Sequence, residues 1–419
     1  MESEQQNFGN SEESKQTTIS SNGDLNKNNE MNEKKLKKKR SLISRFGCLR
    51  SQTASSPDRS SSDEKPYMEM ESVTSEDGPP PTHLVVMVNG ILGSPEDWRF
   101  AAKQFLKRYP KEFLVHCSNC NTASTTLDGV DVMGERLADE VLSVVKRRPE
   151  LQKISFVAHS LGGLVARYAI GRLYSSNPEH NPSEGNGDCS GDGSGNACLE
   201  NKLIVKIAGL EPMNFITVAT PHLGSRGHRQ VPVFCGLRFL EKTAKNTSWL
   251  LGRTGKHLFL IDEDKEKPPL LLQMVNDCGD LRFMSALLSF KRRAAYANVG
   301  YDHLVGWTAS SIRRRNELPK RQQFMKNEKY PHIKYVEAPR VVNSQQEAEM
   351  EVKANGLDAN EMDEAMIRGL NKASWERVDV SFHKSRQRFL AHTAIQVKTY
   401  SINYDGVDVI FHMIDNFLP

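Results

Sequence analysis

The sequence lacks the features that mark membrane-spanning and nucleic-acid-binding proteins. No apolar run approaches the roughly 18 residues that a transmembrane helix needs, and the mean hydropathy is −0.55. The chain has 56 Lys and Arg against 52 Asp and Glu among its 419 residues, a formal net charge of +4. Because phosphate binding needs a concentrated basic face, this balance argues against a nucleic-acid partner. We expect a protein that is soluble or at most peripheral on a membrane.

Paired cysteines and a secretory leader are also missing. The seven cysteines are an odd number at irregular spacing, and the acidic opening MESEQQNFGNSEESK has no apolar segment of the signal-peptide kind. We therefore expect a cytoplasmic protein with reduced thiols. Cys117 and Cys120 form a single C-x-x-C motif without a second pair at a useful spacing. No zinc site, and no other metal or cofactor, is expected.

Two polar stretches hold too little apolar surface to offset the entropy of the chain. We expect residues 1–82 to be a disordered tail and residues 175–202 to be a flexible surface loop. Within the tail, residues 34–50 carry eight basic residues and no acid. Three interpretations stay open for this basic cluster: a solvated charge run, a contact with an anionic membrane surface that acylation of Cys48 would strengthen, and a nuclear or organellar address. The remaining residues 83–419 suit one large domain.

Short apolar runs rich in β-branched residues alternate with helical patterns along this domain. The runs predict buried strands at 83–90, 113–116, 153–158, 216–219, 294–299 and 378–382. Apolar residues at helical spacing follow two of these strands, over 132–145 and 164–173, and a last helical pattern covers 407–417. Such alternation implies an α/β fold with a mostly parallel sheet and helices on both faces. Ligands of these sheets gather at the carboxyl ends of the strands.

The most informative motif is Ala158-His159-Ser160-Leu161-Gly162, where a strand turns sharply into a helix. A serine hydroxyl needs exposure at a tight turn, a base and N–H donors for an oxyanion before it can act as a nucleophile. The small residues Ala158 and Gly162 allow strand and helix to approach closely, although Ala158 replaces the usual first glycine of this motif. We therefore predict that Ser160 is a nucleophile and that the Leu161 N–H is one oxyanion donor. The alternative is an ordinary serine at a helix start.

A second loop supports this prediction. The first strand runs into Asn89-Gly90-Ile91-Leu92-Gly93, and a Gly-containing loop at a strand end can turn another backbone N–H toward the same oxyanion. Ile91 and Leu92 are the two candidates for this donor. Taken alone, the loop is equally compatible with a plain strand-to-helix turn.

Several motifs together resemble a known family. The chain contains VVMVNGILGS, ISFVAHSLGGLVARYAIG, ITVATPHLGS, YANVGYDHLV and FLAHTAIQV. This pattern is similar to the lipase-like serine esterases of the α/β-hydrolase superfamily, a plant-type group related to fungal lipid-acting serine hydrolases. The resemblance covers residues 83–419 outside the polar loop and implies an α/β-hydrolase fold. The group often has His-Gly at the first loop, and since this chain has Asn89-Gly90, only the backbone role is carried over there.

The order of the catalytic residues in this superfamily places the acid and the base. They follow the serine as acid and then histidine, each at a strand end. Asp302 follows the strand predicted at 294–299, where the resemblance also places the acid, and its alternative role is that of a turn residue. His392 lies before the last helix and is the predicted base, with His383 as the alternative base. The remaining histidines of the motifs, His159 and His222, are expected to be structural or to line the substrate.

Two insertions interrupt the alternation. Residues 222–290 are too long for a simple crossover and contain apolar blocks separated by Lys and Arg. They predict a helical cap over the site, and additional core is the alternative. Residues 343–374 are acidic and predict a surface insertion with at most one helix through Met362, Met366 and Leu370.

The predicted activity is hydrolysis of carboxylic ester bonds in lipids, through an acyl-enzyme formed on Ser160. Lipid or acyl-ester substrates are the expected partners, with peripheral membrane contact through residues 34–50 as an addition. The same triad would also serve an acyltransferase or a thioesterase, because the outcome depends on which acceptor reaches the acyl-enzyme. A third possibility is a catalytically silent hydrolase fold that binds a protein or a lipid.

Overall fold

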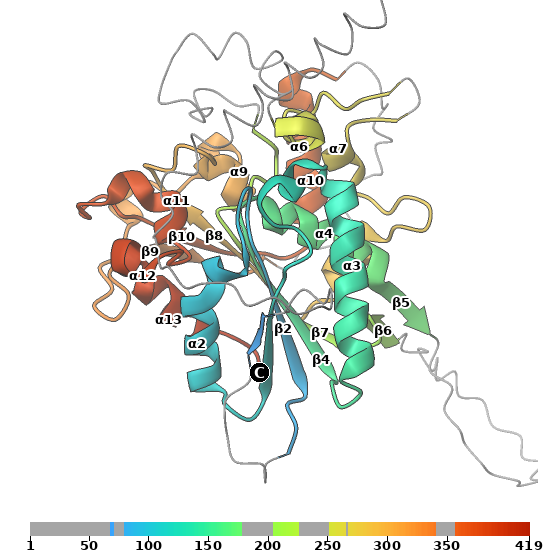
Figure 1. Cartoon of the computed structure of the whole chain (residues 1–419). Helices are drawn as coiled ribbons and strands as arrows, with labels where there is room; N and C mark the ends of the chain where they lie inside the picture. The colour runs from blue at the N-terminus through green and yellow to red at the C-terminus, as the bar shows by residue number, and fades with distance from the viewer. Residues whose placement is uncertain (1–67, 71–78, 178–203, 226–250, 265–266, 341–356) are drawn as a thin grey trace, which may run out of the picture. The chain divides into compact units, whose positions relative to one another are not determined.

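The computed structural model describes residues 68–70, 79–177, 204–225, 251–264, 267–340 and 357–419. Residues 65–419 form one compact unit, whose elements are labelled in Figure 1. The basic cluster 34–50 and residues 178–202 of the predicted loop lie outside the described residues, as does nearly all of the predicted tail. None of the helices in the described ranges has both the length and the hydropathy that crossing a bilayer requires.

The unit is built on one eight-stranded sheet with the order β1-β3-β2-β4-β7-β8-β10-β9. Its strands are β1 (Met68–Met70), β2 (His83–Val88), β3 (Phe113–Cys117), β4 (Lys153–His159), β7 (Glu211–Val218), β8 (Arg292–Asn298), β9 (Ile333–Glu337) and β10 (Glu376–Val380). Every pairing between the inner strands is parallel, and only β1 and β9 pair antiparallel with their neighbours. The six strands predicted from apolar runs are confirmed, and so is the α/β fold with a mostly parallel sheet.

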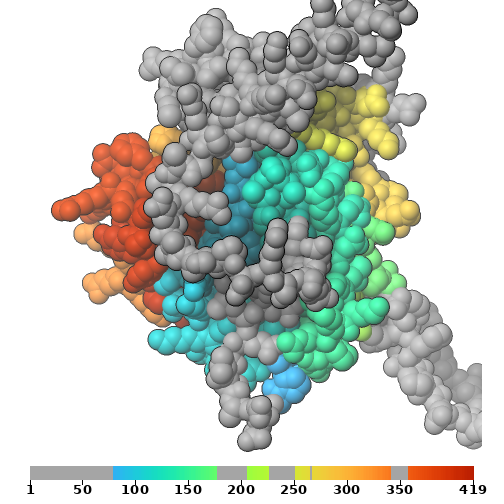
Figure 2. Space-filling view, in the orientation of Figure 1, coloured from blue at the N-terminus to red at the C-terminus, as the bar shows by residue number. Residues whose placement is uncertain are grey.

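Alternating side chains of the strands pack into two separate cores. In β2, Leu84 and Val86 belong to one core and Val85 and Met87 to the other, because successive residues of a strand point to opposite faces. The first core contains α3 (Val130–Arg147), α4 (Leu161–Leu173) and α8 (Phe283–Ser289), and the second contains α2 (Arg99–Arg108) and α13 (Val407–Asp415). In Figure 1, α3 and α4 lie on one side of the strands and α2 and α13 on the other, and Figure 2 shows α3 and the C-terminal elements on separate parts of the surface.

The structure contains strands that the sequence patterns did not predict. β1 lies within the range of the predicted disordered tail, where Glu69 pairs with His116 of β3. β9 extends the other edge of the sheet through its pairing with β10. A separate hairpin-like pair, β5 (Tyr174–Asn177) and β6 (Ile204–Ile207), flanks the polar loop. All four are short, so a period of two residues has little room to appear in them.

The described parts of the insertion 222–290 form α6 (Gly252–Leu258), α7 (Leu270–Gln273) and α8, while residues 226–250 lie outside the description. Leu271, Phe283 and Leu287 are buried in the first core, which favours additional core over a cap for α7 and α8. The insertion 343–374, which was predicted to lie on the surface, also contributes a helix to the core. Its helix α10 (Ala359–Asn371) packs against α7 and buries Met366 and Leu370 completely.

Candidate active site

Ser160 occupies a sharp turn between β4 and α4. Its backbone has φ 53° and ψ −128°, a conformation that costs a non-glycine residue on the order of 1–3 kcal/mol and persists only where the surroundings impose it. Two hydrogen bonds hold this conformation. The Ser160 N–H donates to the Val218 carbonyl at 2.8 Å, and the Ser160 carbonyl accepts from the Gly163 N–H at 3.1 Å. The turn thus places the hydroxyl of Ser160 at the carboxyl edge of the sheet.

Two glycines allow the start of α4 to approach the neighbouring strands. A Cβ on Gly162 would lie 2.5 Å from the carbonyl oxygen of Asn89, and one on Gly163 would lie 2.1 Å from Thr220 Oγ1. Neither distance is compatible with a side chain, and at Gly162 the obstacle is backbone that cannot turn away. The second and third residues of the Leu161-Gly162-Gly163 sequence are therefore required by packing.

Ser160, His392 and Asp302 form one hydrogen-bonded series. Ser160 Oγ lies 3.0 Å from His392 Nε2, and His392 Nδ1 lies 3.0 Å from Asp302 Oδ2. An ionised carboxylate can only accept, so Nδ1 carries the proton and donates it to Asp302. The other ring nitrogen, Nε2, is then free to accept the hydroxyl proton of Ser160. The three residues predicted from loop order are thus brought together, from positions up to 232 residues apart.

The Asp302 carboxylate is held by four donors. Oδ1 accepts from the N–H groups of Leu304 and Val305 at 3.0 and 2.9 Å, and Oδ2 accepts from Asn298 Nδ2 at 2.8 Å as well as from His392. Burial alone would raise the pKa of this carboxyl. The charge and hydrogen bond of His392 and the bonds from Asn298 and Val305 outweigh burial and hold the pKa of Asp302 below its usual value. Asp302 is therefore ionised at neutral pH.

His392 lies in the short helix α11 (Ala391–Ala394) and is held from behind by His159. His159 Nε2 lies 2.7 Å from the His392 carbonyl oxygen, to which it donates, and the two rings are 4.6 Å apart. Burial, with the neighbouring His392 next in importance, keeps the pKa of His159 well below its ordinary value. The segment after α11 is also held by the ion pair between Lys398 Nζ and Asp97 Oδ2 at 2.9 Å. This ion pair ties it to the segment after the first loop.

The loop after β2 presents a backbone donor beside the serine. A Cβ on Gly90 would lie 3.0 Å from the Cβ of Ser160, so the loop is in close contact with the turn. The Leu92 N–H donates to Thr126 Oγ1 at 2.9 Å, and the prediction of Leu92 as an oxyanion donor is therefore not supported. Among the described residues, the N–H groups of Ile91 and Leu161 have no hydrogen-bond acceptor.

The remaining histidines lie away from the serine hydroxyl. His383, the alternative base, is exposed, and its Nδ1 lies 3.0 Å from the hydroxyl of Tyr301. His222 is fully buried, with Nε2 2.9 Å from Thr217 Oγ1 and its ring packed edge-on against Trp375. Burial lowers the pKa of His222, so this residue supports the turn after β7.

Two residues of the site were not singled out from the sequence. Asn298 is the last residue of β8 and orients Asp302, and Thr126 holds the first loop through Leu92. A polar residue at the end of an apolar strand, four positions before the expected acid, is a signal for Asn298. No local pattern points to Thr126, which lies 34 residues from its partner.

Comparisons with known proteins find similarity over the first part of the described domain. The family described as "Putative serine esterase (DUF676)" matches residues 79–312, more than half of the chain. "Putative lipase ROG1" of Saccharomyces cerevisiae is 28% identical over 234 residues, which are 55% of this chain and 28% of that protein. "Putative lipase C4A8.10" of Schizosaccharomyces pombe is 27% identical over 241 residues, 55% of this chain and 26% of that protein. The chain thus spans less than a third of the length of these relatives.

Solved structures show a more distant likeness. The mature form of the lipase BlEst2 from Bacillus licheniformis has a TM-score of 0.32 and 15% identity, and covers 55% of this chain and 71% of that one. The esterase PF2001 from Pyrococcus furiosus has a TM-score of 0.30 and 14% identity, with 62% and 82% covered. At TM-scores of this size the likeness carries no argument about the reaction.

Proposed function

Because the chain belongs to the family of serine esterases that matches residues 79–312, we propose that it hydrolyses carboxylic ester bonds of lipids. In this proposal Ser160 is the nucleophile, His392 the general base and Asp302 the acid that orients His392. The observation that carries the proposal is the hydrogen-bonded series Ser160–His392–Asp302, with both distances at 3.0 Å.

The reaction follows from the protonation states of these groups. Ser160 Oγ attacks the acyl carbonyl while its proton passes to His392 Nε2, and the imidazolium that forms is stabilised by the ionised carboxylate of Asp302. His392 then gives this proton to the alkoxy oxygen of the leaving alcohol, and the acyl group stays on Ser160 as an ester. Water repeats the sequence: it loses a proton to His392, releases the acid and restores Ser160.

Two backbone donors are proposed for the oxyanion. Leu161 N–H lies at the first residue of α4, where the helix leaves its N–H groups unpaired and directs a partial positive charge outward. Ile91 N–H lies in the loop that contacts Ser160 through Gly90. A negative oxygen formed on attack would accept from both, and such donors favour the transition state over the neutral carbonyl.

A lipid substrate is favoured by the apolar residues beside the proposed triad. Phe389 and Leu390 directly precede the helix of His392 and are 60% and 43% exposed, and Leu304 follows Asp302 and is 36% exposed. Leu92, in the loop of the proposed oxyanion donor, is 47% exposed. Exposed apolar side chains gathered at the loops of one site suit an acyl chain better than a small polar ester. The yeast relatives named as lipases point in the same direction.

Labelling with a fluorophosphonate probe tests the nucleophile. The native chain should form a covalent adduct on Ser160, and Ser160→Ala should not. Ser143→Ala, which changes a serine on α3 away from the site, is the matched control and should label like the native chain. Equal labelling of Ser160→Ala and the native chain would refute the proposal, as would a native chain that neither labels nor hydrolyses lipid esters.

A further inference from the structure

A small cavity beside the start of β10 is lined by cations. Its volume is about 160 Å³, and five of its nine lining residues are basic, namely Arg314, Arg340, Arg368, Lys372 and Arg377. No acidic residue lines it. Sites for drug-sized ligands start at roughly 300 Å³, so this cavity suits a small group. A concentration of positive charge around a small volume indicates an anion.

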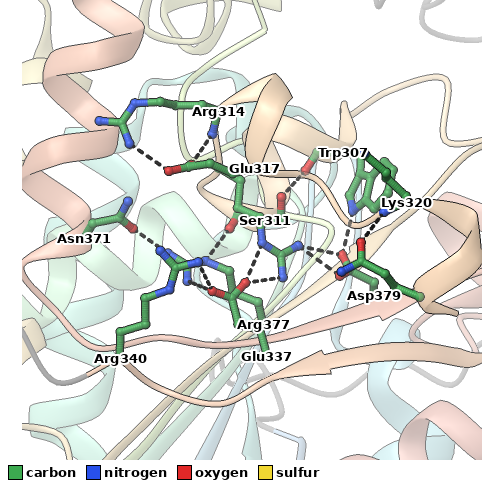
Figure 3. Close-up of polar contacts among 12 residues, drawn as sticks. Trp307, Ser311, Arg314, Glu317, Lys320, Glu337, Arg340, Asn371, Arg377 and Asp379 are labelled. Carbon is green, nitrogen blue, oxygen red and sulfur yellow. Dashed lines mark hydrogen bonds and ion pairs between the residues drawn. The ribbon is translucent and has the colours of Figure 1, made fainter. Parts of the chain in front are cut away.

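The carboxylates of this region lie behind the cations and hold them in place. Glu337 Oε1 lies 2.6 Å from Arg340 Nη2 and 3.3 Å from Arg377 Nη1, and Figure 3 shows the two arginines converging on it from different segments. Arg377 also donates to Asn371 Oδ1 at 2.6 Å and to the Ser311 carbonyl at 3.0 Å. Three partners, Glu337, Asn371 and the Ser311 carbonyl, thus fix the guanidinium of Arg377, a residue that is only 5% exposed.

Arg314 is held in the same manner by Glu317 and Glu364, so that its guanidinium is also oriented by carboxylates outside the lining. Adding Arg313, which pairs with Glu337 and Asp379, gives six cations and four carboxylates. The described groups of this cluster therefore carry an excess of two positive charges.

Two of the lining cations have donors to spare. Lys372 has no carboxylate within ion-pair distance among the described residues, although its ammonium group offers three donors. Arg368 Nε lies 3.7 Å from Glu364 Oε1, beyond hydrogen-bond distance, and this buried nitrogen has no hydrogen-bond partner in the described part of the chain. Both residues close the C-terminal end of α10, where positive charge also favours the helix dipole. That role accounts for their sign but leaves these donors unsatisfied.

We propose that this cavity binds a phosphate group, either free or at the end of a phosphomonoester. A phosphate monoester carries about −1.5 to −2 charges at pH 7, which matches the excess of two, and guanidinium groups recognise its oxygens through paired hydrogen bonds. The site is separate from the proposed triad. Arg377 is the second residue of β10 and pairs with Ala295 within β8, whereas Asp302 follows the carboxyl end of β8.

The test is calorimetric titration of the full chain with inorganic phosphate at constant ionic strength. The double variant Arg368→Gln/Lys372→Gln removes the two cations with spare donors and should weaken phosphate binding about tenfold or more. Lys103→Gln/Lys107→Gln is the matched control, since it removes two exposed cations from α2, and it should bind phosphate like the native chain. Circular-dichroism melting checks that each variant is folded.

A second variant covers the risk that the first one destabilises α10. Arg340→Gln changes a side chain that is 67% exposed, in the segment after β9, and should also weaken phosphate binding. The proposal is overturned if the native chain shows no saturable binding up to about 10 mM phosphate, far above an ordinary affinity. It is equally overturned if the folded variants all bind as tightly as the control.

Vesicle flotation distinguishes the two sources of the phosphate group. Phosphatidylcholine vesicles with and without phosphatidic acid are mixed with the native chain, Arg368→Gln/Lys372→Gln and the control. Association that needs phosphatidic acid, persists in the control and falls in the double variant assigns the cavity to a lipid head group. Equal association of all three proteins, together with weakened phosphate binding in the double variant, assigns it to a soluble phosphate.

Discussion

The two polar clusters of this chain are built in opposite ways. In the series Ser160–His392–Asp302 a single hydrogen bond joins each pair, and the first member is held in a strained backbone conformation. Around Glu337 and Asp379, in contrast, buried charges share several partners each. Asp379 is completely buried and accepts from Arg313 Nη1 with both oxygens, at 3.0 and 2.9 Å, and from Trp307 Nε1 at 2.6 Å. Figure 3 shows residues of this second cluster that come from separate parts of the chain, among them Trp307, Glu337 and Asp379.

The difference in the number of partners fits a proposed catalytic role for Ser160 and a structural role for Asp379. In the proposed reaction Ser160 exchanges its proton and forms a bond, which suits a side chain with few contacts. Asp379 must remain a charge inside the protein, and a buried charge persists only when its partners are complete. We therefore expect the substitution of Ser160 in the first cluster to remove activity and to leave stability nearly unchanged. Substitutions in the second cluster should do the reverse.

The largest effect is expected at the proposed triad. Ser160→Ala and His392→Ala should each lower ester hydrolysis by three or more orders of magnitude, at least about 4 kcal/mol in the barrier. Because Ser160→Ala removes a single side-chain hydrogen bond, the free energy of unfolding of this variant should change by less than about 1 kcal/mol. Ester turnover and urea unfolding of the same preparations measure both quantities. If His383→Ala abolished turnover while His392→Ala kept it, the base would be misassigned.

The reverse pattern is expected at Asp379. Asp379→Asn leaves the Arg313 guanidinium with only Glu337 as a charged partner, and should lower the free energy of unfolding on the order of 3 kcal/mol. Turnover per folded molecule should stay close to that of the native chain. Asp280→Asn, at an exposed aspartate, is the matched control for the change of charge. A loss of stability no larger than that of the control would show that the network is not what supports this end of the sheet.

The sequence predicted the first cluster better than the second for a physical reason. The nucleophile turn is local: strand, Ser160 and helix follow one another within a few residues, and the glycines that α4 needs lie beside the serine. The partners of Asp379 lie 66 and 72 residues away in the chain, and no periodicity links them. The available signal in the sequence was the aspartate itself, because it lies between Val378 and Val380 in a buried strand and a buried charge must find a partner.

Sequence patterns also failed to predict the strands at the edges of the sheet. The strand β4 is buried at six of its seven residues and was predicted from its run FVA, whereas the edge strand β9, with its sequence IKYVE, mixes polar and apolar residues over only five positions. The sequence likewise left two candidates open for the oxyanion donor of the first loop. Ile91 and Leu92 are adjacent, and only the position of Thr126, distant in sequence, distinguishes them.

A third substitution tests whether the first cluster depends on a neutral histidine. Burial keeps the pKa of His159 well below 6.5, so the unfolded chain binds a proton there, at a pH where the folded chain does not. Its share of stability is therefore complete above about pH 6.5 and falls by about 1.4 kcal/mol per pH unit below it. Between pH 7 and 5 this amounts to about 2 kcal/mol.

His159→Gln should remove this share, because a glutamine amide can still donate to the His392 carbonyl and does not titrate. Urea unfolding of the variant should therefore change about 2 kcal/mol less between pH 7 and 5 than unfolding of the native chain. The exposed His383→Gln serves as the control and should follow the native chain. Identical pH dependence of all three proteins would mean that folding does not lower the pKa of His159.

The smallest expected effect is the change in kcat/KM with each methylene added to the acyl chain of the substrate. If the exposed apolar residues beside His392 hold an acyl chain, each added methylene should contribute up to about 0.8 kcal/mol, a three- to fourfold rise in kcat/KM. A series of p-nitrophenyl esters from acetate to octanoate measures this slope. Leu390→Ser should flatten this slope with little change in the rate on acetate.

Leu142→Ser is the matched control, since Leu142 is 48% exposed on α3 and Leu390 is 43% exposed beside the site. Rates that stay flat or fall with chain length in the native chain would leave an esterase of short acyl groups, and the exposed residues at the catalytic edge would then need another explanation.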